Sequence, residues 1–160
     1  MEHSSHHDHA VRDHTAHGST WRTAARATLH CLTGCAIGEI LGMAIGTALL
    51  WGNASTMILA IALAFGFGYS FTLFAVRRAG LGWKAAVKVA LAADTVSIAV
   101  MELVDNGIIA ATGAMDAHLT DALFWSSLLG GFVVASLVTT PVNKWMIDRG
   151  KGHAVVHAYH

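Results

Sequence analysis

The sequence predicts an all-α integral membrane protein, a bundle of four transmembrane helices with both termini in the cytoplasm. First, 54% of its 160 residues are hydrophobic and only 12% are charged, whereas an average soluble domain carries about 25% charged residues. Second, it contains four apolar stretches, each long enough at about 20 residues or more to cross a bilayer as a helix. These are residues 29–51, 54–76, 85–112 and 122–147. Third, the ten Lys and Arg residues are confined to three alternate segments.

The basic residues predict the direction of the spans. They lie within residues 12–26, 77–88 and 144–151, and the connections 51–56 and 113–121 contain none. Because cytoplasmic segments of membrane proteins collect Lys and Arg, we expect both termini and the central connection in the cytoplasm. Amphipathic indole rings favour the headgroup region, and the five tryptophans lie at or near the span ends: Trp21, Trp51, Trp83, Trp125 and Trp145. We expect a multi-pass protein of the bacterial cytoplasmic membrane, in contact with lipid.

Residues 1–20, "MEHSSHHDHAVRDHTAHGST", precede the transmembrane domain of residues 21–160. They show no apolar pattern, so we expect a disordered cytoplasmic tail. Histidine-rich tracts often bind metal ions. A metal-collecting tail, an expression tag and a plain polar tail all remain open.

Two stripes of residues four positions apart run along the first span. One consists of residues that let a neighbouring helix approach closely: Gly34, Gly38, Gly42 and Gly46. The other holds candidate metal ligands on one helical face: Cys31, Cys35, Glu39 and Met43, with His30 just before them. We expect this polar stripe to face protein rather than lipid, and we expect a homo-oligomer assembled through this helix.

The third span carries three carboxyl groups. Asp94, Met101 and Asp105 lie within about 20° of one another on a helix, with Ser97 and Glu102 at the margins. A carboxylate at the bilayer centre costs about 2.5–3.5 kcal/mol on an insertion scale, and every Lys and Arg lies at a boundary. The acids are therefore protonated, line a hydrated cavity or hold a cation, and each alternative places them inside the bundle.

The remaining spans carry less chemistry. The second span contains no ionisable group except Tyr69, so we expect it to serve packing. The fourth span contains Pro141 near its cytoplasmic end, which removes an intrahelical hydrogen bond and predicts a kink.

The ligand types indicate a soft or borderline metal ion. Thiolate and thioether groups suit Cu(I), whereas imidazole and carboxylate also accommodate zinc or nickel. The cysteines are expected as free thiols in a reducing compartment. The C-terminal run "GKGHAVVHAYH" adds three histidines on one face if it is helical, although a plain tail end is equally open. The candidate ligands are His30, Cys31, Cys35, Glu39, Met43, Asp94, Met101, Glu102, Asp105, His153, His157 and His160.

These observations predict a protein that binds and moves a transition-metal cation, copper first, along the first and third spans. We expect no enzymatic activity and no nucleic-acid partner. A non-transporting accessory subunit of a metal-handling membrane complex is the alternative, and metal-handling proteins are then the expected partners. The carboxyl groups would in that case be protonated packing contacts between helices, each worth about 0.6–2 kcal/mol.

Four runs of residues resemble a known family. They are "HCLTGCAIGEILGMAIGTAL", "ALAADTVSIAVMELVDN", "GAMDA" and "TTPVNKWMIDRGKGHAVVHAYH". The chain is similar over about residues 21–160 to a family of small bacterial four-span membrane proteins catalogued as a domain of unknown function. The resemblance implies a multi-pass membrane protein, with some members associated with copper-handling genes. It implies no activity, so no site residue is carried over from it.

Overall fold

The protein is a helical bundle, seen here in a computed structural model that describes residues 8–78 and 80–149, with side chains from residue 21 onward. The helices are α1 (Asp8–Ala48), α2 (Asn53–Arg78), α3 (Trp83–Thr112) and α4 (Ala122–Asp148), with a short 3₁₀ helix η1 (Ala114–Asp116) between α3 and α4. The described residues contain no strand. The predicted all-α fold class is therefore confirmed, and apart from the start of α1 the helix ends lie within a few residues of the four predicted spans.

The start of α1 differs from the prediction. The helix begins at Asp8, so residues 8–20, which we expected to be disordered, are helical. Extending an existing helix fixes one residue for each hydrogen bond gained, which is far less costly than starting a new helix. The polar composition of this segment therefore did not prevent the apolar helix that follows it from continuing backwards.

Three of the helical segments are long and apolar enough to cross a membrane: Trp21–Ala48, Asn53–Arg78 and Ala122–Asp148. The chain is thus a membrane protein by length and composition. Helix α3 has 30 residues, about 45 Å at the helical rise of 1.5 Å per residue. It carries more charged residues than any of those three segments: Lys84, Lys88, Asp94, Glu102 and Asp105.

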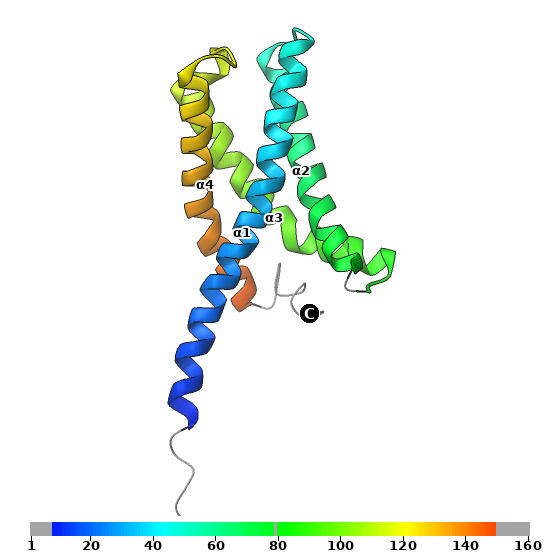
Figure 1. Cartoon of the computed structure of the whole chain (residues 1–160), viewed down its shortest axis with the longest axis vertical. Coiled ribbons are helices and arrows are strands. Elements are labelled where there is room, and N and C mark those ends of the chain that lie inside the picture. Colours follow the sequence, from blue (N-terminus) through cyan, green and yellow to red (C-terminus); the bar gives the residue numbers. More distant parts are fainter. Residues whose placement is uncertain (1–7, 79, 150–160) are drawn as a thin grey trace, which may run out of the picture.

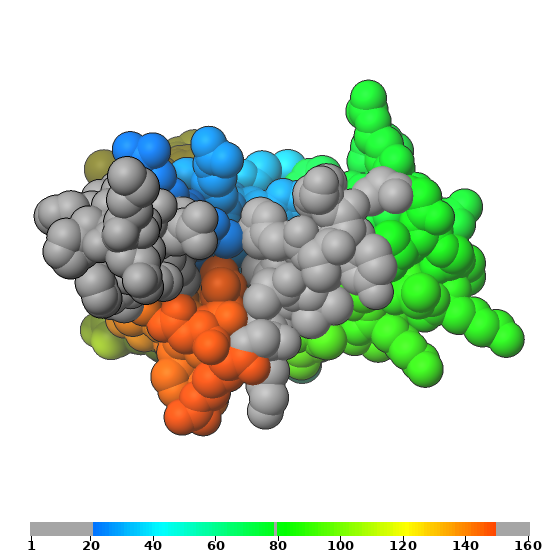
Figure 2. Space-filling model, turned by 90° about the horizontal axis from the view of Figure 1, so that it is seen from below, coloured from blue at the N-terminus to red at the C-terminus, as the bar shows by residue number. Residues whose placement is uncertain are grey.

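The helices form two sides with α3 passing between them. Helices α1 and α2 run antiparallel side by side, α4 forms the other side, and α3 crosses from the foot of α2 to the top of α4 (Figure 1). One end of the bundle, the loop end, carries the α1–α2 and α3–α4 connections. At the opposite end, the last turns of α4 and the α2–α3 connection reach the same face as α1 (Figure 2). We call this the basic end, because the described Lys and Arg residues lie towards it: Arg22, Arg26, Arg77, Arg78, Lys84, Lys88, Lys144 and Arg149.

The glycine stripe of α1 packs against α2. A Cβ atom on Gly34 would lie 2.8 Å from the Cα atom of Gly68, and one on Gly38 would overlap the backbone of Ala64. The stripe thus brings the two backbones together, as small residues do in membranes. Its partner is a helix of the same chain, so the stripe is not open to a second copy. The predicted homo-oligomer stays a prediction and requires another surface.

Local signals set the ends of α3 and α4. Helix α3 ends at Gly113, whose φ of 71° lies in the left-handed region and whose N–H contacts the carbonyl oxygens of Ala110 and Ile109. Asp121 precedes α4, and its carboxylate accepts the backbone N–H of His118 at 2.9 Å. Helix α4 continues through Pro141 to Asp148.

Candidate functional site

A neutral hydrogen-bonded network ties three helices together in the half of the bundle nearer the basic end. The Ser97 hydroxyl of α3 donates to Oδ1 of Asn143 on α4. The Asn143 amide donates to Thr28 Oγ1 of α1 at 2.9 Å, and Thr140 Oγ1 donates to the same oxygen at 3.2 Å. We call these four residues the inner network. Ser97, Asn143 and Thr28 are each at most 2% exposed, so the network lies in the core.

His30 and Asp94 also lie in this half of the bundle. Nε2 of His30 is 3.2 Å from the Thr72 hydroxyl of α2, and Thr72 also lies beside the carboxyl group of Asp94. Asp94 is 1% exposed. Thr72 therefore joins two predicted ligands that come from different helices, although they are 64 positions apart in the sequence.

Apolar and sulfur-containing side chains form a central layer towards the loop end. Each is at most 1% exposed, and they are Cys31, Cys35, Ala64, Ile98, Met101 and Ala135. Both cysteines are free thiols, and the two sulfhydryl groups lie beside each other. Ile98 fits over Gly68, where a Cβ atom would lie 2.6 Å from its Cδ1 atom. The layer contains three of the predicted sulfur ligands, Cys31, Cys35 and Met101. It fills the space between the polar groups on its two sides.

Three carboxyl groups meet on the loop-end side of the central layer. Glu39 of α1 lies beside Glu102 and Asp105 of α3, and their exposures are 0%, 5% and 1%. Asn106 donates its amide to Glu39 Oε1 at 3.3 Å and to Glu102 Oε2 at 3.2 Å. We call these four residues the outer carboxyl cluster. Cys35 borders it, beside Glu102.

The cluster has fewer donors than acceptors. Four of its buried oxygens accept no hydrogen bond from any described residue: Glu39 Oε2, Glu102 Oε1 and both carboxyl oxygens of Asp105. No described Lys or Arg forms an ion pair with these acids. Asp105 faces Gly131 of α4, and a Cβ atom there would overlap its Oδ1 atom. The arrangement thus holds buried acceptor oxygens that a proton or a cation would satisfy.

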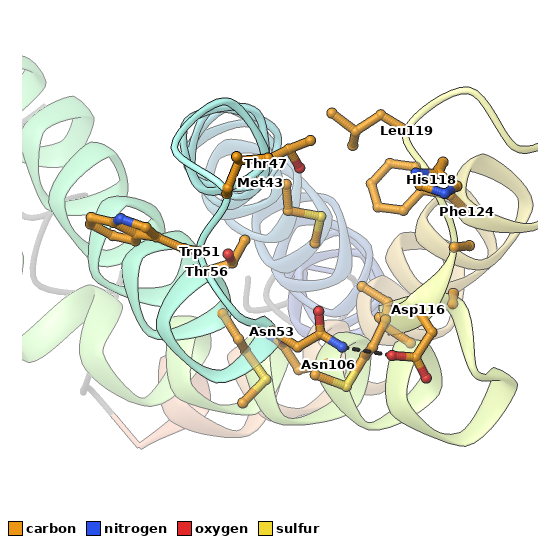
Figure 3. Close-up of a pocket in the computed structure, with 16 residues that line it drawn as sticks. Met43, Thr47, Trp51, Asn53, Thr56, Asn106, Asp116, His118, Leu119 and Phe124 are labelled. Carbon is orange, nitrogen blue, oxygen red and sulfur yellow. Dashed lines mark hydrogen bonds between the residues drawn. The ribbon is translucent and has the colours of Figure 1, made fainter.

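A cavity of about 400 Å³ opens at the loop end, between the ends of the helices. We call it the vestibule. Its walls include Met43, Thr47 and Trp51 from α1 and the loop after it, Asn53 from α2, and Asn106 from α3 (Figure 3). On the far side are η1 and the loop that leads to α4, with Asp116 and His118. Asn106 both lines the vestibule and donates to the carboxyl cluster, so it joins the two.

The structure divides the predicted ligands among these levels. Their inward orientation on α1 and α3 is confirmed for the buried members: Cys31, Cys35, Glu39, Asp94, Met101, Glu102 and Asp105. Asp105 lies eleven positions after Asp94 in α3, about 17 Å along a helix, so Asp94 lies at another level from the other acids. No three His, Cys, Asp or Glu side chains in the part of the chain with described side chains form a metal-holding group. His153, His157 and His160 lie outside the described residues.

Sequence reasoning missed three polar positions and one glycine. Asn106 follows Asp105 and lies four residues after Glu102, so its place near the carboxyls could have been read from the helical spacing. Asn143 stands alone in an apolar span, which was itself a signal for a buried partner. His118 and Gly131 depend on how α4 packs against the other helices, and no local pattern marks them.

Comparison with known proteins gives one match. The family model described as "Domain of unknown function (DUF4396)" matches residues 20–152, which is most of the chain. No curated protein and no solved structure matches it. The matched region takes in the described parts of all four helices that build the levels above, with the inner network, the outer carboxyl cluster and the vestibule. The chain therefore belongs to the DUF4396 family.

Proposed function

We propose that the protein binds a transition-metal cation, copper first, and moves it across the bacterial cytoplasmic membrane along α1 and α3. Helix α3 serves as the fourth span, and both termini are cytoplasmic. The histidines near the termini collect or deliver the ion, and the carboxyl groups couple its movement to protons. Zinc and nickel are the other cations that the ligand types accommodate.

The outer carboxyl cluster carries the proposal. Glu39, Glu102 and Asp105 are buried with unpartnered oxygens and without a described basic neighbour. Buried acids of this kind are costly, and inside membrane proteins they typically mark ion and proton pathways. Packing alone would favour neutral groups that satisfy one another, as the inner network does. The cluster is therefore best explained as a site that protons and the transported cation occupy alternately.

The central layer supports a soft cation. Cys31, Cys35 and Met101 share one buried cluster, and thiolate and thioether sulfur favour Cu(I) over harder ions. Because no three His, Cys, Asp or Glu side chains of the described residues already form a metal-holding group, an ion at this level would combine sulfur with carboxylate and require side-chain rotation.

One observation favours the second candidate, an accessory subunit that does not transport. The central layer is closed, with Ile98 and Met101 both at 0% exposure. A transporter must open this layer during its cycle, whereas an accessory protein need not. The protonated carboxyl groups would then serve to hold the helices together inside a larger complex.

Ion flux separates the two candidates. The purified chain in liposomes that contain a metal-sensitive dye should transport Cu(I) faster than empty liposomes and faster than it transports Zn(II). Cys35→Ser should slow Cu(I) flux more than Zn(II) flux, because it exchanges a soft ligand for a harder oxygen. Asp148→Asn, which removes an exposed carboxylate paired with Lys144 at 2.5 Å, is a control outside the proposed path and should transport normally. Flux equal to that of empty liposomes for every metal would favour the accessory subunit.

Thiol labelling in cells tests the topology. Both native cysteines are 1% exposed, so they give little background with an impermeant reagent. Ser55→Cys at the loop end should react from outside, and Lys84→Cys at the basic end should react only after the membrane is permeabilised. The opposite pattern would reverse the proposed orientation.

A further inference from the structure

We propose that the vestibule is a binding site for a soft monovalent cation, Cu(I) or Ag(I), with Met43, Met57, Met115 and His118 as its ligands. The inference rests on the proposed function for its biological role. It deepens that function by placing the first binding site of the ion path on the loop-end side. It adds three ligands that the sequence pattern did not indicate.

The lining of the vestibule is rich in soft ligands. The chain has six methionines, and three of them line this one cavity. They come from separate elements, Met43 from α1, Met57 from α2 and Met115 from η1, and His118 joins them from the loop before α4. Methionine often fills gaps in apolar cores, but here the three side chains border about 400 Å³ of space. Thioether and imidazole together select Cu(I) and Ag(I) over hard cations.

The polar part of the lining suits a cation of low charge. No Lys or Arg lies among the residues that line the vestibule. Asp116 contributes the carboxylate, and its Oδ1 atom accepts the Asn53 amide at 2.7 Å, which fixes η1 against the start of α2 (Figure 3). Neutral sulfur ligands balance no charge, so a monovalent ion costs less to dehydrate here than a divalent one. Asn106 lines the vestibule and also donates to the carboxyl cluster. An ion that moves from the vestibule to the cluster would therefore pass this residue.

Methyl NMR resolves the site without relying on transport. The full chain carrying Cys31→Ser and Cys35→Ser, labelled with ¹³C at the methionine methyl groups, would be titrated with Ag(I) in detergent micelles. Without thiols, the methyl signals of Met43, Met57 and Met115 should shift together and saturate near one Ag(I) per vestibule. Met146, which is 4% exposed near the basic end, is the internal control and should not shift. Single Met→Leu variants assign the signals.

Ligand removal gives the second readout. Met57→Leu combined with Met115→Leu keeps apolar volume and removes two ligands. It should weaken Ag(I) binding at the Met43 signal by at least the roughly 10–100-fold that loss of an outer-shell partner of a metal ligand typically costs. Met146→Leu is the matched control and should leave binding unchanged. Unshifted vestibule methionines at saturating Ag(I) would overturn the proposal, and so would shifts produced by apolar additives but not by Ag(I). Vestibule binding without flux would instead count against the proposed transport alone.

Discussion

The inner network and the outer carboxyl cluster lie between the same three helices, α1, α3 and α4, yet they have opposite chemistry. The inner network takes one residue from α1, one from α3 and two from α4. The outer cluster takes Glu39 from α1 and its other residues from α3, and it faces α4 at Gly131. In the inner network all the groups are neutral: Ser97 donates to Asn143, and Asn143 donates to Thr28. In the outer cluster, Glu39 and Asp105 are acids whose oxygens outnumber the nearby donors. Both are buried to the same degree, so burial does not distinguish them.

Under the proposed function, the difference separates a structural role for the inner network from a binding role for the outer cluster. A satisfied network of amides and hydroxyls lowers the energy of one helix arrangement and needs nothing further. An acidic cluster with too few donors is stable only when a proton or a cation occupies it, because an uncompensated buried carboxylate is costly. Removing a side chain from the inner network should therefore affect stability, and removing a charge from the outer cluster should affect transport.

The largest expected effect is the loss of flux in Glu39→Gln. The amide keeps the size and the hydrogen bonds of the side chain but neither takes up a proton nor balances a cation. Cu(I) flux in liposomes should fall to that of empty liposomes, while the unfolding midpoint in detergent stays within a few degrees of the parent. Full flux in this variant would mean that transport does not need the Glu39 carboxyl group. The outer cluster would then not differ in role from the inner network.

Asn143→Ala should show the converse. The variant leaves the buried Ser97 hydroxyl without its acceptor and removes the donor to Thr28, which should lower the free energy of unfolding by about 1–3 kcal/mol. Denaturation in mixed micelles measures it. Asn106→Ala, from the half-buried edge of the outer cluster, is the counterpart and should cost less stability. Equal losses in the two variants would show that the outer cluster is structural as well.

The smallest expected effect belongs to Gly131→Ala. Its Cβ atom would overlap the Asp105 carboxyl group, so that side chain must move, at about 1 kcal/mol for mild overpacking. Gly130→Ala is the matched control, because nothing lies within 4 Å of a Cβ atom there. We expect slower Cu(I) flux and slightly lower stability in the first variant only. Identical behaviour of both variants would mean that the position of Asp105 is unimportant.

The helices and their inward faces could be predicted because each depends on local patterns. Span length and apolar content define the helices, and the 3.6-residue period places Cys35, Glu39 and Asp105 on buried faces. The glycine stripe predicted close packing, but no pattern in the stripe identifies α2 rather than a second copy as its partner. The division of the ligands into levels was not predicted either. It depends on the depth at which α1 and α3 cross, and that follows from tertiary packing.

The residues that the prediction missed were missed for one physical reason, which is that their roles depend on tertiary packing. His118 and Met115 lie in a connection, where no periodicity assigns a face, and the vestibule exists only because the helix ends diverge there. Asn143 and Gly131 matter through contacts with side chains on other helices. Their residue types carried a weak signal, since an amide in an apolar span needs a partner and a glycine in a helix often makes room for one.

The close contact between α1 and α2 limits which parts of the bundle can move. Gly34 and Gly68 bring two backbones into contact, and close-packed surfaces of this kind resist sliding because any shift drives backbone into backbone. A conformational cycle that opens the central layer would therefore keep α1 and α2 as a fixed frame. Helix α4 would then be the helix that moves. It would rotate about the hydrogen bonds of Asn143, and Gly131 would move away from Asp105.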